Sequence, residues 1–182
     1  GQLTLVPSAL TVAADAPYNT VKEFVDYALA HPGEVTIGNS GAGSIWHIAA
    51  TYLEQVSGAK FNHIPFDGAA PAVTALMGGH INAVTVNAGE VLSGVEAGKL
   101  KILAIMTEER DPNMPDVPTM KESGFDVVIG GWGGLGVPKG TPADVMEKLS
   151  AAVEKATDSQ EFKDFISQRG MVVCYKNSAD FT

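Results

Sequence analysis

Apolar residues follow two alternating patterns along the first hundred positions of the chain. Segments with an apolar residue every three or four positions, as on one face of a helix, alternate with short runs rich in β-branched residues, as in strands. Helices that alternate with strands predict an α/β fold with a mostly parallel sheet. The predicted helices are 20–30, 45–57, 70–77 and 88–97, and the predicted strands are 3–6, 10–14, 35–37, 61–66, 81–86 and 100–106.

Two places in this pattern carry a more specific expectation. Pro7-Ser8 separates the first two apolar runs, so two short strands are expected there. The run from Leu100 to Met106 is the most strongly apolar one, which makes it the best candidate for the centre of the sheet.

The pattern changes after Thr107. Residues 108–118 are polar and rich in proline, which predicts a connection between layers or lobes. A strand starting at 127–129 then runs into four glycines around Trp132. Two roles are open for this tryptophan: it stacks on a ligand, or it packs over the crossover between the lobes. Two helices and a last strand at 171–175 follow, and the first of these helices is expected to face inward with Val145, Leu149, Ala152, Val153 and Ala156.

The stretch from Gly38 to His47 joins a strand to a helix through a turn of glycines and serines. Such a turn leaves the first N–H groups of the helix without partners, and glycine lets a ligand approach the backbone. This stretch therefore has the main features of an anion-binding site. Ser40 and Ser44 add hydroxyl donors, and Ser44 or Gly43 is the expected N-cap.

Motifs with a sharper chemistry fit this stretch poorly. Ser44 stands where a Walker loop needs lysine, and Trp46 replaces the third glycine of the dinucleotide pattern. Gly38-Asn39-Ser40-Gly41-Ala42 lacks the last glycine of a nucleophile elbow. Three hypotheses stay open: a carboxylate site, a tight turn that binds nothing, and a serine hydrolase with Ser40 as nucleophile and His47 or His63 as base.

Two further turns follow predicted strands. Phe66 to Ala70 forms a second glycine and alanine turn that opens a helix, and Asn87 comes directly after the strand at 81–86. In open α/β sheets ligands lie at the carboxyl ends of the strands. Ser40, Phe66 to Ala70 and Asn87 are therefore predicted to meet at one edge of the sheet.

Composition narrows the class of protein. The chain has 182 residues, 45% of them hydrophobic, which suffices for one large domain or two small lobes. Its net charge of −9, with no basic run, argues against nucleic acid as a partner. A small anion is not excluded, because backbone N–H groups act locally whereas net charge is screened beyond about 10 Å.

The residues give little indication of a metal site, a bound cofactor or a membrane-spanning helix. Cys174 is the only cysteine and the four histidines are scattered, so neither a metal site nor a cofactor is expected. No apolar run reaches the roughly 20 residues of a membrane helix. The sequence begins in mid-pattern, with neither Met nor a signal peptide, and is expected to be cut from a longer protein.

Six motifs occur in a fixed order along the chain. They are Gly38-Asn39-Ser40-Gly41-Ala42-Gly43-Ser44 with His47, the segment from His63 to Ala72, Gly78-Gly79-His80-Ile81-Asn82, Ala97-Gly98-Lys99-Leu100, Pro115-Asp116-Val117-Pro118-Thr119 and Pro138-Lys139-Gly140-Thr141-Pro142. Together they resemble the tripartite tricarboxylate transporter substrate-binding proteins, the Bug or TctC-like family of periplasmic solute receptors. Members have a signal peptide and an opening βαβ segment before the position that matches Gly1, so this chain resembles a receptor without its N-terminal part.

The resemblance implies an α/β fold like that of type II periplasmic binding proteins, with two lobes of mostly parallel sheets flanked by helices. Residues 16–104 would form one lobe, and residues 1–15 with 105–182 would form the remainder of the other, incomplete lobe. The implied protein is a periplasmic receptor and not an enzyme. It would bind a small organic carboxylate, such as a di- or tricarboxylate, an aromatic acid or an acidic amino acid, and deliver it to the membrane subunits of a transporter.

The resemblance also implies a site. Receptors of this family hold carboxylates with backbone N–H groups, small hydroxyls and water at helix starts. By position, that role falls to Ser40, Gly43, Ser44 and His47 in the first loop, to Phe66, Gly68 and Ala69 in the second, and to Asn87. Two residues depart from the family pattern: Asp67 replaces a basic or polar residue, so that it would repel a carboxylate or recognise an amine, and Val86 replaces a common aspartate.

Overall fold

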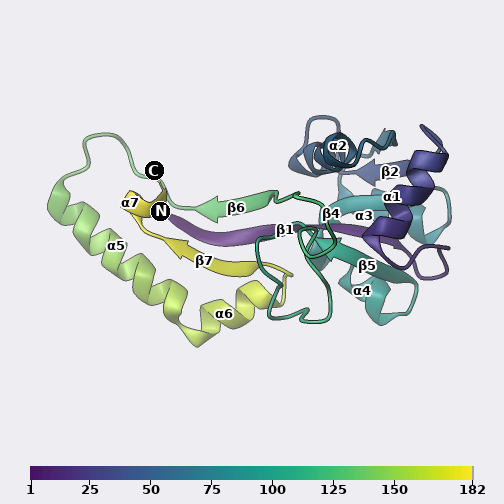
Figure 1. Ribbon diagram of the computed structural model, residues 1–182. Helices are drawn as coiled ribbons and strands as arrows, with labels where there is room; N and C mark the ends of the chain where they lie inside the picture. The colour runs from purple at the N-terminus through teal and green to yellow at the C-terminus, as the bar shows by residue number, and fades with distance from the viewer. Residues whose placement is uncertain (182) are drawn as a thin grey trace.

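One long strand, β1 (Gln2–Ala13), runs through the molecule and is shared by two sheets (Figure 1). In the computed structural model, which describes residues 1–181, the first half of β1 pairs with β6 (Gly130–Gly134) and β7 (Val172–Lys176). Its second half pairs with β4 (Ala83–Asn87) and β5 (Leu100–Ile105). Each end of the strand therefore builds a different part of the protein.

The two short strands expected at the start of the chain are one continuous strand, so the predicted break at Pro7-Ser8 is wrong. Pro7 is the last residue of β1 that pairs with β6, opposite Gly130. Ser8 is the first that pairs with β4. Because the proline lies where β1 changes partners, its missing N–H interrupts neither ladder.

The sheet is mixed, and its strand directions follow a simple rule. β2 (Thr36–Asn39) is parallel to β3 (Asn62–Pro65) and to β4, in the spatial order β3-β2-β4-β1-β5. β1 is antiparallel to all four of its partners, so it alone runs against the other strands of the described chain. The predicted α/β class with a mostly parallel sheet is thus confirmed, with β1 as the antiparallel exception.

The strand expected at the centre of the sheet lies at the end of this order, so that prediction is wrong. Leu103 and Ala104 of β5 are buried in the core on one face of the sheet, and Leu100 is buried on the other. At the carboxyl end of β5, the Met120 N–H donates a hydrogen bond to the Ile105 carbonyl oxygen at 2.9 Å. β5 is strongly apolar because both of its faces are covered, although it has only one strand neighbour.

Helices cover both faces of the larger sheet. On β4, Ala83 faces the core formed with α1 (Val21–Ala30) and α2 (Ile45–Ser57), whereas its neighbour Val84 faces the core formed with α3 (Ala69–Met77). Successive strand residues point to opposite faces, so this one pair of residues separates the two cores. The helix expected at 88–97 is divided into η1 (Ala88–Glu90) and α4 (Leu92–Glu96).

The smaller sheet carries the C-terminal helices, α5 (Ala143–Asp158), α6 (Gln160–Ser167) and α7 (Ser178–Phe181), as Figure 1 shows. The inward face expected for α5 is wrong in this structure, since Val145 and Leu149 are 39% and 44% exposed. Leu149 and Val153 line a cavity of about 510 Å³ with Tyr175 and Phe181. In the described chain this apolar side of α5 has no second layer of structure over it.

The two parts of the molecule also touch at a pair of glycines. Gly89 of η1 packs against the backbone of Arg169 and Gly170, in the turn between α6 and β7. A Cβ atom on Gly89 would overlap the Arg169 carbonyl oxygen, and one on Gly170 would overlap the backbone of Gly89. Glycine at both positions therefore allows the two parts to meet.

The first prediction concerns this contact. Gly89→Ala should lower the free energy of unfolding by about 1–3 kcal/mol, because the added methyl group forces the two backbones apart. Gly136→Ala is the matched control, since an added Cβ there meets no atom within 4 Å; it should change stability by less than about 1 kcal/mol. Urea denaturation of both variants measures the difference. Equal midpoints would show that the close glycine contact does not matter for stability.

Candidate functional site

The carboxyl ends of β2, β3 and β4 lie side by side, and the residues predicted for the site follow them. Asn39 pairs with Pro65 in parallel register, and the Phe66 N–H donates to the Asn39 carbonyl oxygen at 3.0 Å. A Cβ atom on Gly41 would lie 3.6 Å from the Phe66 carbonyl oxygen. The first and second loops are therefore neighbours, while Asn87 ends the next strand, β4.

The first loop satisfies most of its own donors. Ser44 is the N-cap of α2, and its Oγ accepts the His47 N–H at 3.2 Å. The Gly43 N–H, expected to hold a carboxylate, donates to Nδ1 of the same histidine at 3.0 Å. The Ser44 N–H donates to the Gly41 carbonyl oxygen at 3.1 Å, and the Gly41 N–H donates to Asn39 Oδ1 at 3.1 Å. The structure thus pairs Gly43 and His47 with each other.

The second loop differs in this respect. Gly68, with a φ of 104°, is the N-cap of α3, and no side chain caps this helix. The helix begins at Ala69, which is almost fully buried, and continues through Ala70. The first N–H groups of a helix have no partner within it and carry the positive end of its dipole. The start of α3, where Ala69 and Ala70 carry N–H groups and Pro71 does not, is therefore the better candidate of the two loops for holding an anion.

Two buried polar side chains next to these loops were missed by the sequence analysis. Ser8 on β1 and Asn39 on β2 are fully buried, and the Ser8 Oγ and Asn39 Nδ2 have no hydrogen-bond partner among the described residues. Ser8 lies opposite Asn87 in the β1–β4 register. In the sequence, Ser8 stands in the predicted break between two strands and Asn39 in the predicted turn of glycines and serines, so neither position is expected to be buried.

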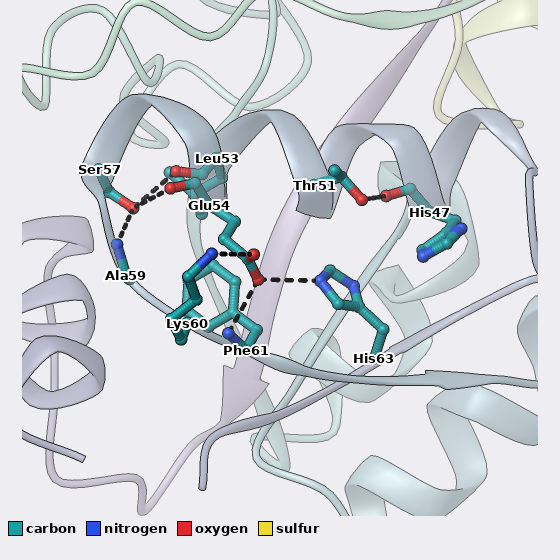
Figure 2. Close-up of polar contacts among 9 residues, drawn as sticks. All are labelled: His47, Thr51, Leu53, Glu54, Ser57, Ala59, Lys60, Phe61 and His63. Atoms are coloured by element: carbon teal, nitrogen blue, oxygen red, sulfur yellow. Dashed lines mark hydrogen bonds and ion pairs between the residues drawn. The ribbon is translucent and has the colours of Figure 1, made fainter. Parts of the chain in front are cut away.

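A cluster of a carboxylate, Glu54, and two imidazoles, His47 and His63, lies between α2 and β3, as Figure 2 shows. Glu54 of α2 accepts hydrogen bonds from the Phe61 N–H at 2.9 Å and from Lys60 Nζ at 3.3 Å. Its Oε2 also lies 3.1 Å from His63 Nε2. The His63 ring in turn meets the His47 ring edge to face, with 5.0 Å between the ring centroids. Glu54 thereby fixes the end of α2 to β3.

These contacts change the acidity of Glu54. Burial by itself raises the pKa of this carboxyl group, but the hydrogen bonds from Phe61, His63 and Lys60 outweigh it and hold the pKa below its ordinary value of 4.5. Glu54 is therefore ionised at neutral pH, and its partners stabilise the charged form.

The hydrolase hypothesis finds no support in this arrangement. A serine hydrolase needs the nucleophile hydrogen-bonded to an imidazole whose other nitrogen is held by a carboxylate. Nδ1 of His47 is occupied by Gly43, and Nε2 of His63 is occupied by Glu54. The remaining ring nitrogen of His63 is buried without a partner among the described residues, so no hydrogen bond joins it to Ser40.

Three cavities of the molecule lie away from the predicted residues. The largest adjoins α5, a second of about 440 Å³ lies between β6, β7 and residues 106–112, and a third lies between α4, β5 and residues 113–117. None of the three is lined by Ser40, Gly68 or Asn87. The candidate site at the carboxyl edge of the larger sheet is therefore separate from these three cavities.

Two sheets that share one strand, with helices on both faces of the larger sheet and glycine loops at its carboxyl edge, define an α/β fold. The chain belongs to the TctC family, described as the tripartite tricarboxylate transporter family receptor, whose model matches residues 1–182. The family expected from the six sequence motifs is thus confirmed. Within residues 1–181, no helix has both the length and the hydropathy needed to cross a bilayer.

Individual relatives agree with the family and the fold. The "UPF0065 protein in gbd 5'region" of Cupriavidus necator is 36% identical over 172 residues, which cover 94% of this chain and 52% of the relative. A TctC solute binding protein from Polaromonas, solved with no ligand, matches with a TM-score of 0.88 and 47% identity over 99% of this chain and 62% of its own. The predicted fold, like that of periplasmic binding proteins, is confirmed.

MatC from Rhodopseudomonas palustris, solved with bound malate, matches with a TM-score of 0.77 and 31% identity over 94% of this chain and 59% of its own. The chain spans about half the length of the curated relatives it matches.

The second prediction tests the Glu54 cluster. Glu54→Gln should lower the free energy of unfolding by about 1–2 kcal/mol at neutral pH, because three donors lose their charged acceptor. Since the folded-state pKa is lowered, this contribution is present above the ordinary carboxyl pKa of 4.5 and is lost as the pH falls through the folded value. Urea denaturation at several pH values should therefore show the two proteins converging in acid.

Glu34→Gln is the control for this series, since Glu34 is an exposed glutamate in the turn before β2. It should leave stability unchanged at every pH. A stability loss for Glu54→Gln that stayed constant in acid would contradict the ionic character of the cluster.

Proposed function

We propose that the protein containing this chain is an extracytoplasmic receptor that binds a small organic carboxylate and delivers it to a tripartite tricarboxylate-type membrane transporter. The observation that carries the proposal is the start of α3, which has no side-chain cap and lies at the carboxyl edge beside the loop of Ser40. The malate bound to MatC is a dicarboxylate, and that relative supports the same ligand class.

The proposed site binds through dipoles rather than through a basic side chain. Backbone N–H groups at the start of α3, the hydroxyls of Ser40 and Ser44, and the amide of Asn87 would hold the carboxylate. Each charge-assisted hydrogen bond contributes about 1.5–3 kcal/mol when water is excluded. A few such bonds give an affinity in the roughly micromolar range after the cost of association.

The role of the protein is binding and not catalysis, and its place is the periplasm or its equivalent, because a receptor for an uptake transporter meets its ligand outside the cytoplasm. A signal peptide upstream of Gly1 belongs to the same proposal. The division into residues 16–104 as one lobe, and residues 1–15 with 105–182 as part of the other, remains a proposal as well. The second half of β1 adds two strand pairings to the sheet of the first of these lobes.

Asp67 directs the choice among carboxylates. It is an exposed acidic residue between Phe66 and Gly68, next to the start of α3. A negative charge there disfavours a second carboxylate nearby and favours an amine. Comparing malate with aspartate therefore tests whether the ligand is a plain dicarboxylate or an acidic amino acid.

The third prediction tests ligand binding by this chain. Malate, citrate, benzoate and aspartate are each added during thermal unfolding, and the acid that fits should stabilise the chain by about 2.7 kcal/mol at a concentration 100 times its dissociation constant. Ser40→Ala should weaken the binding of that acid about tenfold, because a hydroxyl donor is lost. The absence of a shift with every acid would contradict the receptor proposal for this chain.

The fourth prediction tests the backbone donors directly. Ala69→Pro removes one N–H at the first position of α3, where proline fits a helix, so it should weaken binding about tenfold while the helix stays intact. Ala143→Pro at the first position of α5 is the matched control and should leave binding unchanged. Isothermal titration calorimetry measures both, and circular dichroism verifies the helices. Equal affinities of the two variants would show that the start of α3 does not hold the ligand.

A further inference from the structure

His47, one of the predicted site residues, makes two hydrogen bonds within the first loop. Its Nδ1 accepts the Gly43 N–H at 3.0 Å, and its own backbone N–H donates to Ser44 Oγ at 3.2 Å. Gly43 has a φ of 77°, a left-handed conformation. One residue of α2 thus holds both the glycine in this conformation and the serine that caps the helix.

The bond from Gly43 requires a neutral imidazole. Nδ1 can accept a hydrogen bond only through its lone pair, so the ring proton is on Nε2. When the ring takes up a second proton, both nitrogens become donors and Nδ1 carries a hydrogen that faces the Gly43 N–H. Protonation therefore replaces a hydrogen bond by a repulsive contact between two donors.

We propose that His47 is a positioning residue that fixes the first loop in its binding conformation only while its ring is neutral, so that ligand capture weakens in mild acid. The effect on capture rests on the proposed carboxylate site. The effect on the loop does not, because it follows from the bond between His47 and Gly43 alone. Ser40 and Ser44 lie on either side of Gly43, so a change at Gly43 moves both hydroxyls expected to hold the ligand.

Other charged groups surround this histidine. His63 of β3 lies against its ring, and Glu54 of α2 and Lys60 of the turn between α2 and β3 are joined to His63 through the Glu54 carboxylate. Asp67, in the loop after β3, is exposed to solvent. His63 is itself an imidazole bonded to a carboxylate, and it contacts the His47 ring. The two histidines must therefore be tested separately.

The experiment follows the Gly43 amide proton by hydrogen exchange, expressed as a protection factor so that the intrinsic effect of pH is removed. In the unchanged chain the protection factor should fall about fivefold to tenfold between about pH 8 and pH 5, as the hydrogen bond is lost. His47→Asn places an amide oxygen near the position of Nδ1, keeps the acceptor and cannot titrate. Its Gly43 protection should stay high and independent of pH.

Two further variants complete the test. His47→Phe removes the acceptor, so Gly43 should be poorly protected at every pH. His63→Gln keeps a donor for Glu54 but removes the titrating ring, and the pH dependence of Gly43 should persist in it. Constant protection in the unchanged chain, or a pH dependence that persists in His47→Asn and disappears in His63→Gln, would overturn the proposal.

The affinity for a carboxylate is measured separately from the exchange of the Gly43 amide proton. The affinity for malate should fall about fivefold to tenfold between about pH 8 and pH 5 in the unchanged chain and stay constant in His47→Asn. If Gly43 behaves as expected but no carboxylate binds at either pH, the proposed function fails while the positioning role of His47 stands. If malate binds with the same pH dependence in His47→Asn as in the unchanged chain, the positioning role fails while the receptor stands.

Discussion

The hydrogen-bond ladders of β1 are the constraint on which the rest of the structure depends. Four strands pair with it, and they come from segments as distant in sequence as residues 83–87 and 172–176. The strand changes partners between Pro7 and Ser8, so both parts of the molecule are joined through one stretch of extended backbone. The buried Ser8 marks this change and lies opposite Asn87, which places the candidate site next to the junction.

The two loops at the carboxyl edge both join a strand to a helix through glycines, but they differ in whether side chains take up their backbone donors. The first is stabilised by its own side chains, since Asn39, Ser44 and His47 take up its donors. The second leaves the start of α3 without a side-chain cap. The order of the first loop and the unpaired donors of the second complement each other. Because the ordered first loop lies against the second, it holds the N–H groups at the start of α3 in one orientation.

Sequence periodicity predicted the elements whose pattern is local. Helix α1 begins one residue after its predicted start, behind the N-cap Thr20, whose Oγ1 accepts the Glu23 N–H, and α2 begins at the predicted position behind its expected N-cap Ser44. Sequence periodicity failed where contacts between residues distant in the sequence determine how a strand is placed. The proline of β1 is tolerated because of its partners, and β5 is apolar because other elements cover its faces. The site followed the same rule: the loops were visible in the sequence, whereas the bond between Gly43 and His47 needed the folded geometry.

The net charge of −9 and an anionic ligand are compatible only if the site depends on local geometry. Oriented backbone dipoles act over the first turn of a helix, whereas the diffuse negative charge of the surface is screened within about 10 Å at physiological salt. Such a site has no mobile cationic side chain to follow a displaced ligand, so its affinity depends on how well the backbone is held in place. We therefore expect His47, which holds the loop backbone through Gly43, to influence binding at the proposed site.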